Sequence, residues 1–326
     1  MVRVLGNGAR RGRKMGWIGW ILLALAVLAL GVFGLWRWAM ATQSVALLDR
    51  VDALFTASVA EVSEPVAFGT APAQVLLVAK PASATGPLPV VVFIHGGSWS
   101  HGKAGEYGFV ARNLSARGYV GVSAGYRLVP GGEYPAMLED GAAAVRWVRD
   151  NIARYGGDPD RIVLMGHSAG AYNAVMLALD PQWLAAAGVP ATSIRGAIGL
   201  AGPYDFLPLD SEGTINAFGK APDLAKTQPI GFIRKDAPPL LLITGDADKT
   251  VRPRNSKVLA KALSDLGIPT DPVLVPDMGH VGILLALARP FEGDGTVKSA
   301  IFDFLARETA TARPSDSSGD IQAAAR

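Results

Sequence analysis

Short apolar runs alternate with longer segments of helical periodicity from Val75 to Ala306. Several of the runs are continuously apolar, as expected for strands that are covered on both faces. This alternation predicts an α/β fold with a doubly wound, mostly parallel sheet. The strand candidates are Val75–Ala79, Val90–Ile94, Val120–Ala124, Ile162–Met165, Ala197–Ala201, Leu240–Thr244 and Pro272–Val275. The helix candidates are Met137–Tyr155, Ala169–Ala178, Asn255–Leu266 and Val297–Ala306.

The alternation divides the chain into segments. A domain over residues 71–308 is long enough for one large core, since half of all residues are hydrophobic. Within it, residues 207–238 contain Gly and Pro between two strand candidates, and we interpret them as a small lid. Residues 37–70 are predicted to form a stem, with an amphipathic helix near Ser44–Thr56 that lies against the domain or a membrane surface. Residues 309–326 are small and polar and are expected to be disordered.

A 21-residue segment without charged side chains, Gly16–Trp36, precedes the stem. At about 1.5 Å of rise per residue, a helix of this length spans about 30 Å, the thickness of a bilayer's hydrocarbon core. Residues 1–15 before it carry five cations, whereas only Arg37 follows it closely. The positive-inside rule therefore predicts a single-pass anchor with a cytoplasmic N-terminus and an exported domain. Tryptophans near both ends fit interfacial anchors: Trp17, Trp20, Trp36 and Trp38.

A cleaved signal peptide is the alternative interpretation of this segment. Ala39-Met40-Ala41 resembles a small-residue cleavage site. The apolar segment is longer than the roughly 7–15 residues of a signal-peptide core, however, and Arg37 and Trp38 separate it from that site. In both cases the domain is exported, either anchored to the membrane or secreted.

The net charge of +3 does not indicate nucleic-acid binding, because residues 1–15 alone carry +5 and the remainder therefore carries −2. A slightly acidic domain lacks the electrostatic footprint of a nucleic-acid-binding protein. The chain has no cysteine, which excludes disulfides, thiol catalysis and thiolate metal sites. Its four dispersed histidines form no ligand motif, so we expect no metal.

The strongest chemical signal is Gly166-His167-Ser168-Ala169-Gly170, a G-x-S-x-G sequence between a strand candidate and a helix candidate. A serine on such a sharp turn needs small neighbours, because the backbone is strained there. The turn would place the Ser168 hydroxyl above the sheet, at a helix N-terminus that favours negative charge. We therefore predict that Ser168 is a nucleophile.

A serine hydroxyl needs a base within hydrogen-bond reach. On turns of this type the partners follow along the chain in the order serine, acid, histidine. Only His280 follows Ser168, so we predict that it is the base. The complete set of histidines is His95, His101, His167 and His280.

The orienting acid is expected in the loop after Leu240–Thr244, where two aspartates compete. The G-x-x-D-x-x-V spacing favours Asp248, whereas Asp246 is better placed to shape the turn. Asp277, three residues before His280, is a third candidate. The acid would hold the imidazole in the correct tautomer and stabilise the imidazolium.

The segment His95-Gly96-Gly97-Ser98-Trp99 follows the strand candidate Val90–Ile94. Its two glycines let the backbone approach a bound carbonyl closely. We expect Trp99 mainly to pack and also to line the substrate pocket, and His95 to brace the loop rather than to transfer protons. The predicted oxyanion-hole donors are the amides of Gly97, Ser98 and Ala169.

These motifs resemble the esterase/lipase branch of the α/β-hydrolases, which includes hormone-sensitive-lipase-like, arylformamidase-like and feruloyl-esterase-like enzymes. The resemblance runs from about Val75 to Leu305. It rests on H-G-G-S-W at 95–99, G-H-S-A-G at 166–170 and, between them, Tyr126-Arg127-Leu128-Val129-Pro130, Tyr134-Pro135-Ala136 and Tyr155-Gly156-Gly157-Asp158-Pro159-Asp160-Arg161-Ile162. It implies about eight strands, no cofactor and acyl transfer through an acyl-serine, and it supports Ser168, Asp248 and His280 by position. Ser98 stands where lipase-like members often have a third glycine, which is closer to the arylformamidase-like subgroup and leaves the substrate class open.

Residues and resemblance together predict a membrane-anchored serine carboxylic-ester hydrolase for short to medium acyl or aryl esters. An amidase or arylformamidase would use the same residues and stays an alternative. A non-catalytic, membrane-tethered binding protein with a hydrolase fold is the second alternative. The predicted partners are a small ester or amide substrate and membrane lipid, and the sequence leaves the oligomeric state open.

Overall fold

The computed structural model describes residues 16–42, 45–56, 58–83, 86–289, 291–293 and 295–310. The chain divides into two compact units, one ending at Ser44 and the other beginning at Val45. The predicted basic tail, residues 1–15, lies outside the described residues, as does most of the predicted disordered tail, residues 309–326. The first residue of that tail, Thr309, is instead buried and donates a hydrogen bond to the Leu305 carbonyl at 2.7 Å. The side chains of Trp36 and Trp38, predicted interfacial anchors, also lie outside the described residues.

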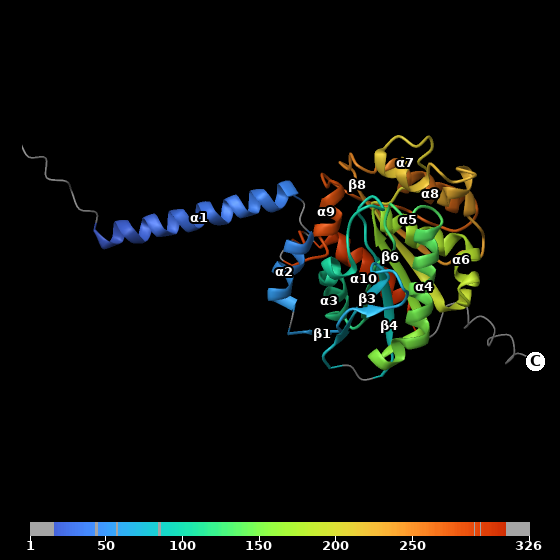
Figure 1. The fold of residues 1–326 in the computed structure, drawn as a ribbon, viewed down its shortest axis with the longest axis horizontal. Helices are drawn as coiled ribbons and strands as arrows, with labels where there is room; N and C mark the ends of the chain where they lie inside the picture. Colours follow the sequence, from blue (N-terminus) through green and yellow to red (C-terminus); the bar gives the residue numbers. More distant parts are fainter. Residues whose placement is uncertain are drawn as a thin grey trace, which may run out of the picture. The chain divides into compact units, whose positions relative to one another are not determined.

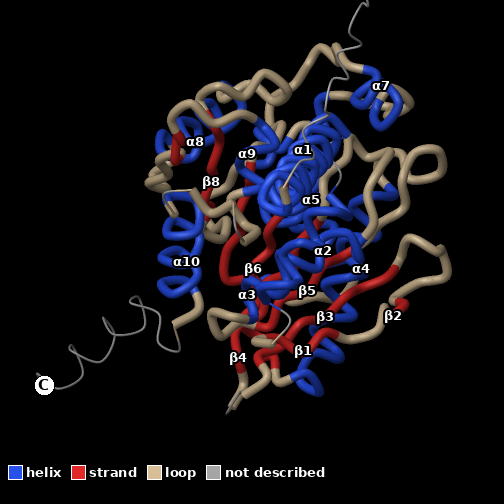
Figure 2. The backbone as a smooth tube through the Cα atoms, turned by 90° about the vertical axis from the view of Figure 1, so that its left-hand side faces the viewer, coloured by secondary structure: helices blue, strands red, loops and turns tan. Residues whose placement is uncertain are grey.

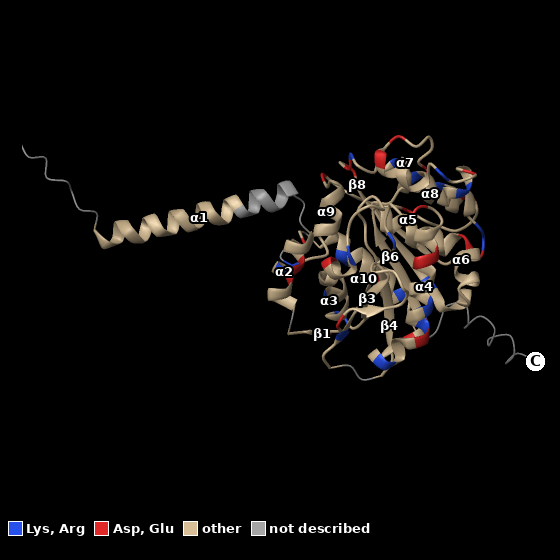
Figure 3. Cartoon of the chain, viewed as in Figure 1, with Lys and Arg blue, Asp and Glu red and all other residues tan. Residues whose placement is uncertain are grey.

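The first unit contains helix α1, Trp17–Thr42 (Figure 1). Its segment Trp17–Gly34 has no charged side chain (Figure 3) and is the one span among the described residues that is long and apolar enough to cross a membrane. Large apolar side chains are exposed along it, with Trp17 74% and Leu30 70% exposed. Length and composition fit either a membrane span or a signal sequence.

The second unit is built on one mostly parallel sheet, as predicted. Its strand order is β1-β3-β5-β4-β6-β7-β8-β9, and β2 pairs with β3 beside this path. The pairs from β5 to β9 are parallel, whereas β3 runs antiparallel to β1, β2 and β5. The strands are β1 Ala60–Val62, β2 Val66–Ala67, β3 Val75–Pro81, β4 Leu88–Ile94, β5 Val120–Ala124, β6 Gly157–His167, β7 Ile194–Leu200, β8 Leu240–Gly245 and β9 Val273–Val275.

Helices cover both faces of this sheet (Figure 1). Alternate side chains of β4 show the two layers: Val90 and Val92 belong to the core that contains α4 and α5, and Val91 and Phe93 to the core that contains α3 and α10. Burial on both faces explains why the strand candidates are continuous apolar runs. The helices of this unit are α2 Val45–Thr56, α3 Gly108–Ser115, α4 Ala136–Asn151, α5 Ala169–Leu179, α6 Pro181–Ala186, α7 Glu212–Phe218, α8 Arg254–Asp265, α9 His280–Leu285 and α10 Thr296–Glu308.

The strand order reverses at β4, which lies between β5 and β6. In doubly wound sheets, ligands bind in the crevice at the carboxyl ends of the strands where the order reverses. The loop after β4 begins with His95–Trp99, and the turn after β6 is Gly166–Gly170. The topology therefore brings the two strongest sequence motifs to the same edge of the sheet.

Most of the predicted stem belongs to the domain. Helix α2 lies beside α3 on one face of the sheet (Figure 2), and β1 and β2 pair with β3. The structure therefore moves the start of the domain from the predicted residue 71 to Val45. The helix predicted near Ser44–Thr56 is present as α2 and lies against the domain.

A buried ion-pair network fixes α2 to the domain. Arg112 of α3 donates to Asp49 at 2.9 Å and to Asp52 at 3.1 Å. The Asp52 side chain is fully buried and also accepts hydrogen bonds from the Asn113 amide group and the Arg289 backbone amide, each at 2.8 Å. These donors compensate the buried carboxylate.

Replacing Asp52 with alanine should lower the free energy of unfolding by about 3–5 kcal/mol, because the buried Arg112 and its neighbours lose a shared partner. Urea denaturation of the full chain in detergent, followed by tryptophan fluorescence, measures this. The matched control is Glu61→Ala: the Glu61–Lys80 pair is exposed, and such pairs contribute at most about 1 kcal/mol. Equal effects of the two substitutions would contradict the role given to Asp52.

Candidate active site

Ser168 lies on the turn between β6 and α5, as the motif predicts. Its φ of 55° and ψ of −122° are values that L-residues rarely adopt. The glycines on either side make this turn feasible. A Cβ at Gly166 would lie 2.1 Å from the carbonyl oxygen of Gly170, and one at Gly170 would lie 2.0 Å from that of Ile94. Larger residues are therefore excluded at positions 166 and 170.

His280 and Asp248 form a hydrogen-bonded pair, with His280 Nδ1 2.8 Å from Oδ2 of the fully buried Asp248 side chain. The other carboxylate oxygen accepts from the amides of Thr250 and Val251, each at 2.9 Å. Burial alone raises the pKa of Asp248, but the hydrogen bond from His280 and those from the two amides outweigh it, and the pKa lies below its ordinary value. Because an ionised carboxylate only accepts, Nδ1 carries a proton, and the tautomer that this bond selects has its lone pair on Nε2.

The two other candidate acids hold the loop instead of the imidazole. Oδ1 of Asp246 accepts a hydrogen bond from the Asp277 amide at 2.7 Å. Gly245 packs tightly against the same loop, since a Cβ there would lie 1.9 Å from the carbonyl oxygen of Met278. These contacts fix the loop that leads to His280 beside the strand that leads to Asp248.

Ser168 and His280 are brought together through His167. Nε2 of His167 is 3.1 Å from the carbonyl oxygen of His280, and the two imidazole centroids are 4.8 Å apart. Among the described residues, no hydrogen bond joins the Ser168 hydroxyl to the His280 ring. In free enzymes such bonds are often long and close only when substrate binds.

The loop His95–Trp99 lies against the nucleophile turn. A Cβ at Gly96 would lie 3.1 Å from the Cβ of Ser168. Ser98 and Ala169 line the same cavity as Ser168, whereas Gly97 is not among its lining residues. Within the described part of the chain, the amides of Gly97, Ser98 and Ala169 donate no backbone hydrogen bond, as the predicted role of oxyanion donors requires. Three successive loop residues have a positive φ: Gly97 at 112°, Ser98 at 51° and Trp99 at 58°.

His95 and Trp99 support this loop. The His95 ring stacks on Tyr107 and on Tyr126, and burial lowers its pKa to about 4, so the ring is neutral near pH 7. Trp99 is 3% exposed, and its indole N–H donates to the Asn173 side chain at 3.3 Å. Its ring also packs edge-on against Phe218 in α7 and borders the cavity. Trp99 therefore contacts both the predicted lid, through Phe218, and helix α5, through Asn173.

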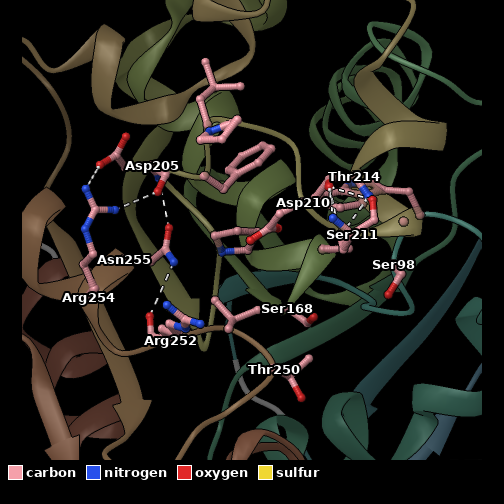
Figure 4. Close-up of a pocket in the computed structure, with 18 residues that line it drawn as sticks. Ser98, Ser168, Asp205, Asp210, Ser211, Thr214, Thr250, Arg252, Arg254 and Asn255 are labelled. Carbon is pink, nitrogen blue, oxygen red and sulfur yellow. Dashed lines mark hydrogen bonds and ion pairs between the residues drawn. The ribbon is translucent and has the colours of Figure 1, made fainter.

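A cavity of about 440 Å³ opens beside Ser168. Figure 4 shows Arg252, Arg254 and Asn255 on one side of Ser168, and Ser98, Ser211 and Thr214 on the other. Arg254 is paired with Asp205 at 2.6 Å. Part of the wall comes from the predicted lid, namely Leu207, Pro208, Asp210, Ser211, Gly213 and Thr214. Among the described residues, no group of three or more acidic or histidine side chains is arranged to hold a metal ion.

Sequence reasoning gave no role to several residues of this site. The cavity walls at Asp205 and at Arg252–Asn255 belong to no recognisable sequence motif. The one indication of them was that the predicted lid lies between two strand candidates. His167 occupies a variable position of the G-x-S-x-G pattern. Its place next to the nucleophile was the one available signal.

The BD-FAE family model matches residues 76–263, more than half of the chain. The chain belongs to the BD-FAE family. Together with the relatives below, this places it in the esterase/lipase branch of the α/β-hydrolases and confirms the resemblance inferred from its motifs.

The curated relatives of this BD-FAE chain include two named esterases. Esterase LipQ of Mycobacterium tuberculosis is 30% identical over 234 residues, which cover 67% of this chain and 55% of LipQ. A probable isoprenylcysteine alpha-carbonyl methylesterase of Arabidopsis thaliana, ICMEL1, is 29% identical over 249 residues, 69% of this chain and 52% of that protein. The chain thus spans about half the length of these relatives.

Solved structures confirm the fold of this BD-FAE member. Esterase B from Lactobacillus rhamnosis has a TM-score of 0.68 at 21% identity, over 86% of this chain and 94% of that one. The sheet with helices on both faces is therefore an α/β-hydrolase fold, as predicted.

Proposed function

We propose that the chain is a serine carboxylic-ester hydrolase that acts through an acyl-serine intermediate. The observation that carries the proposal is the part-buried Asp248–His280 hydrogen bond, together with Ser168, a serine held at positive φ on a strand-to-helix turn. Its chain neighbour His167 lies 3.1 Å from the His280 carbonyl oxygen. The names of the relatives, an esterase and a probable methylesterase, support an ester substrate.

In the proposed mechanism, Nε2 of His280 accepts the Ser168 proton while Oγ attacks the ester carbonyl. The carbonyl oxygen becomes negative and accepts hydrogen bonds from the oxyanion-hole amides of Gly97, Ser98 and Ala169. The tetrahedral intermediate collapses, and the alcohol leaves with the proton from His280. Water then attacks the acyl-serine with His280 again as base, which releases the carboxylic acid and the free serine. Asp248 stabilises the imidazolium without taking its proton.

The cavity favours short to medium acyl or aryl esters. Its volume of about 440 Å³ suits a small ligand. Its walls combine apolar side chains such as Phe206 with charged ones such as Asp210 and Arg252. A long acyl chain would have to cover some of these charged groups and remove them from water, which is unfavourable.

A substrate panel tests the proposal. p-Nitrophenyl esters from acetate to palmitate are compared with an N-formyl aryl amide and a short peptide. We expect kcat/KM to be highest for acetyl to octanoyl esters and lower for palmitate and for both amides. Faster turnover of the formyl amide would instead favour the arylformamidase alternative. Well-folded protein that neither turns over an ester nor reacts with a fluorophosphonate would indicate the non-catalytic alternative.

The proposal includes a membrane anchor. Helix α1 would cross the bilayer once, with residues 1–15 in the cytoplasm and the domain exported, and it would bind membrane lipid. Its length and uncharged composition support this. Carbonate extraction with mass analysis of the mature N-terminus separates the alternatives. An intact N-terminus in the carbonate-resistant membrane fraction is expected, whereas a soluble chain that begins after Ala41 would show cleavage and secretion.

A further inference from the structure

His167 makes a side-chain contact that the proposed reaction does not use. Its ring is buried, with the residue 5% exposed, and Nε2 is 3.1 Å from the carbonyl oxygen of His280. A carbonyl oxygen has no proton, so Nε2 must carry one and donate it. This requirement defines the tautomer of the His167 ring.

The same residue also touches the oxyanion loop. A Cβ at Gly96 would lie 2.8 Å from the carbonyl oxygen of His167 and 3.3 Å from its Nδ1. His167 is therefore confined between Gly96 on the loop after β4 and His280 at the start of α9, and it directly precedes Ser168. His167 thus lies where the nucleophile turn, the oxyanion loop and the loop of the base meet.

Other contacts also hold the loop that carries His280: the Asp277 amide donates to Asp246 at 2.7 Å, and Nδ1 of His280 is 2.8 Å from Asp248 Oδ2. Asp277, three residues before His280, has a φ of 54°, outside the common regions for L-residues. The Met278 carbonyl accepts a hydrogen bond from the Ala247 amide at 3.2 Å. Helix α9, which begins at His280, is only six residues long. The bond from His167 therefore acts on the backbone of the base itself, at the point where the loop becomes a helix.

We propose that His167 is a positioning residue for the base: by donating from Nε2 to the His280 carbonyl, it holds the His280 imidazole within reach of the Ser168 hydroxyl. The inference rests on the proposed function, because it takes His280 as the base. His167 does not line the cavity beside Ser168, and it acts through the backbone of His280.

The charge state of His167 fits this role. Burial lowers its pKa to about 3, and the neighbouring His280 contributes to that shift. His167 is therefore neutral while the imidazolium forms on His280. A charged ring 4.8 Å away would oppose that positive charge.

Two substitutions in the full-length protein test the hydrogen bond. His167→Met introduces an apolar side chain of similar size that has no hydrogen-bond donor. In His167→Gln the side-chain amide can still donate to the His280 carbonyl. With p-nitrophenyl butyrate we expect His167→Met to lower kcat by about 10- to 100-fold, since small misplacements of a reacting group have effects of this size. KM should stay within about threefold. His167→Gln should recover most of kcat, and the rate of fluorophosphonate labelling should follow kcat.

A purely structural role gives a different result. It would lower the melting temperature of both variants without a difference in kcat between Met and Gln, and equal kcat values for the two would overturn the proposal. If neither variant folds, ¹⁵N-histidine NMR of the wild-type protein decides. A slowly exchanging proton on Nε2 of His167 is expected, and a proton on Nδ1 would overturn the assignment. Wild-type protein that hydrolyses no ester, with Ser168→Ala indistinguishable from it, would instead count against the proposed function.

Discussion

Replacing Ser168 with alanine should lower kcat/KM for p-nitrophenyl butyrate by about 10⁴- to 10⁶-fold, because no acyl-enzyme can form without the hydroxyl. The residual rate should come from binding and from the oxyanion-hole amides, which the substitution leaves in place. Fluorophosphonate labelling should disappear at the same time. Steady-state kinetics on the purified full-length chain in detergent measure the change.

The matched control for this experiment is Ser264→Ala. Ser264 is exposed on α8, and its hydroxyl is hydrogen-bonded to the backbone of the nearby Thr270. Its replacement should change kcat/KM by less than about twofold. A Ser168→Ala protein that keeps more than about one hundredth of the wild-type rate, once contaminating esterase is excluded, would identify a different nucleophile.

Asp248→Asn should lower kcat by about 10³- to 10⁴-fold while the protein stays folded. The asparagine amide can donate to Nδ1 of His280, and this would stabilise the tautomer with its proton on Nε2, which cannot accept the serine proton. In the wild-type protein the pKa of Asp248 lies below its ordinary value of 3.8. The carboxylate is therefore ionised at neutral and mildly acidic pH, and protonation of this acid should not limit activity there.

Asp246→Asn provides the comparison for this second prediction. Asp246 accepts from the Asp277 amide, and an asparagine oxygen can accept the same bond. Its activity should therefore fall by less than about tenfold. A larger loss in Asp246→Asn than in Asp248→Asn, measured at equal melting temperature, would reverse the assignment of the acid.

Much of the fold could be predicted because its strands are buried on both faces. The segment Val120–Ala124 was predicted with the bounds that the structure shows, and Leu240–Thr244 is one residue short of β8. Gly156, which follows the helix candidate Met137–Tyr155, ends the short 3₁₀ turn after α4 with a φ of 77°. Continuous apolar runs and left-handed glycines are local signals, so a single sequence carries them.

The elements that were missed have no such local signal. All eight residues of α3 are buried, including Arg112 and Asn113, so the helix has no polar face to reveal its period. Strands β1 and β2 are three and two residues long and exist through their pairing with β3. That pairing is a tertiary contact, which a single sequence does not reveal. The segment that contains β1 and β2 was therefore predicted to be part of a stem.

In the candidate site, too, the residues with a local sequence signal could be predicted, and those that depend on tertiary contacts could not. Asp248 could be preferred over Asp246 by spacing alone, because the loop after a buried strand has a fixed geometry, and the structure places Asp248 on the imidazole. The cavity walls could not be predicted, because they join the lid to the start of α8 across a long stretch of chain. The contact of His167 with the His280 carbonyl also joins residues more than a hundred positions apart.

The position at which the domain begins determines whether it could be released intact from the N-terminal helix. Helix α1 ends at Thr42, and the compact unit starts at Val45. A peptidase that cuts after Ala41 would therefore liberate α2, its bonds to Arg112 and the whole reaction centre as one intact body. If α1 is the proposed anchor, shed and tethered forms of the proposed esterase would share the same turnover number. They would differ only in the substrate that they reach, dissolved esters for the shed form and esters concentrated at a lipid surface for the tethered form.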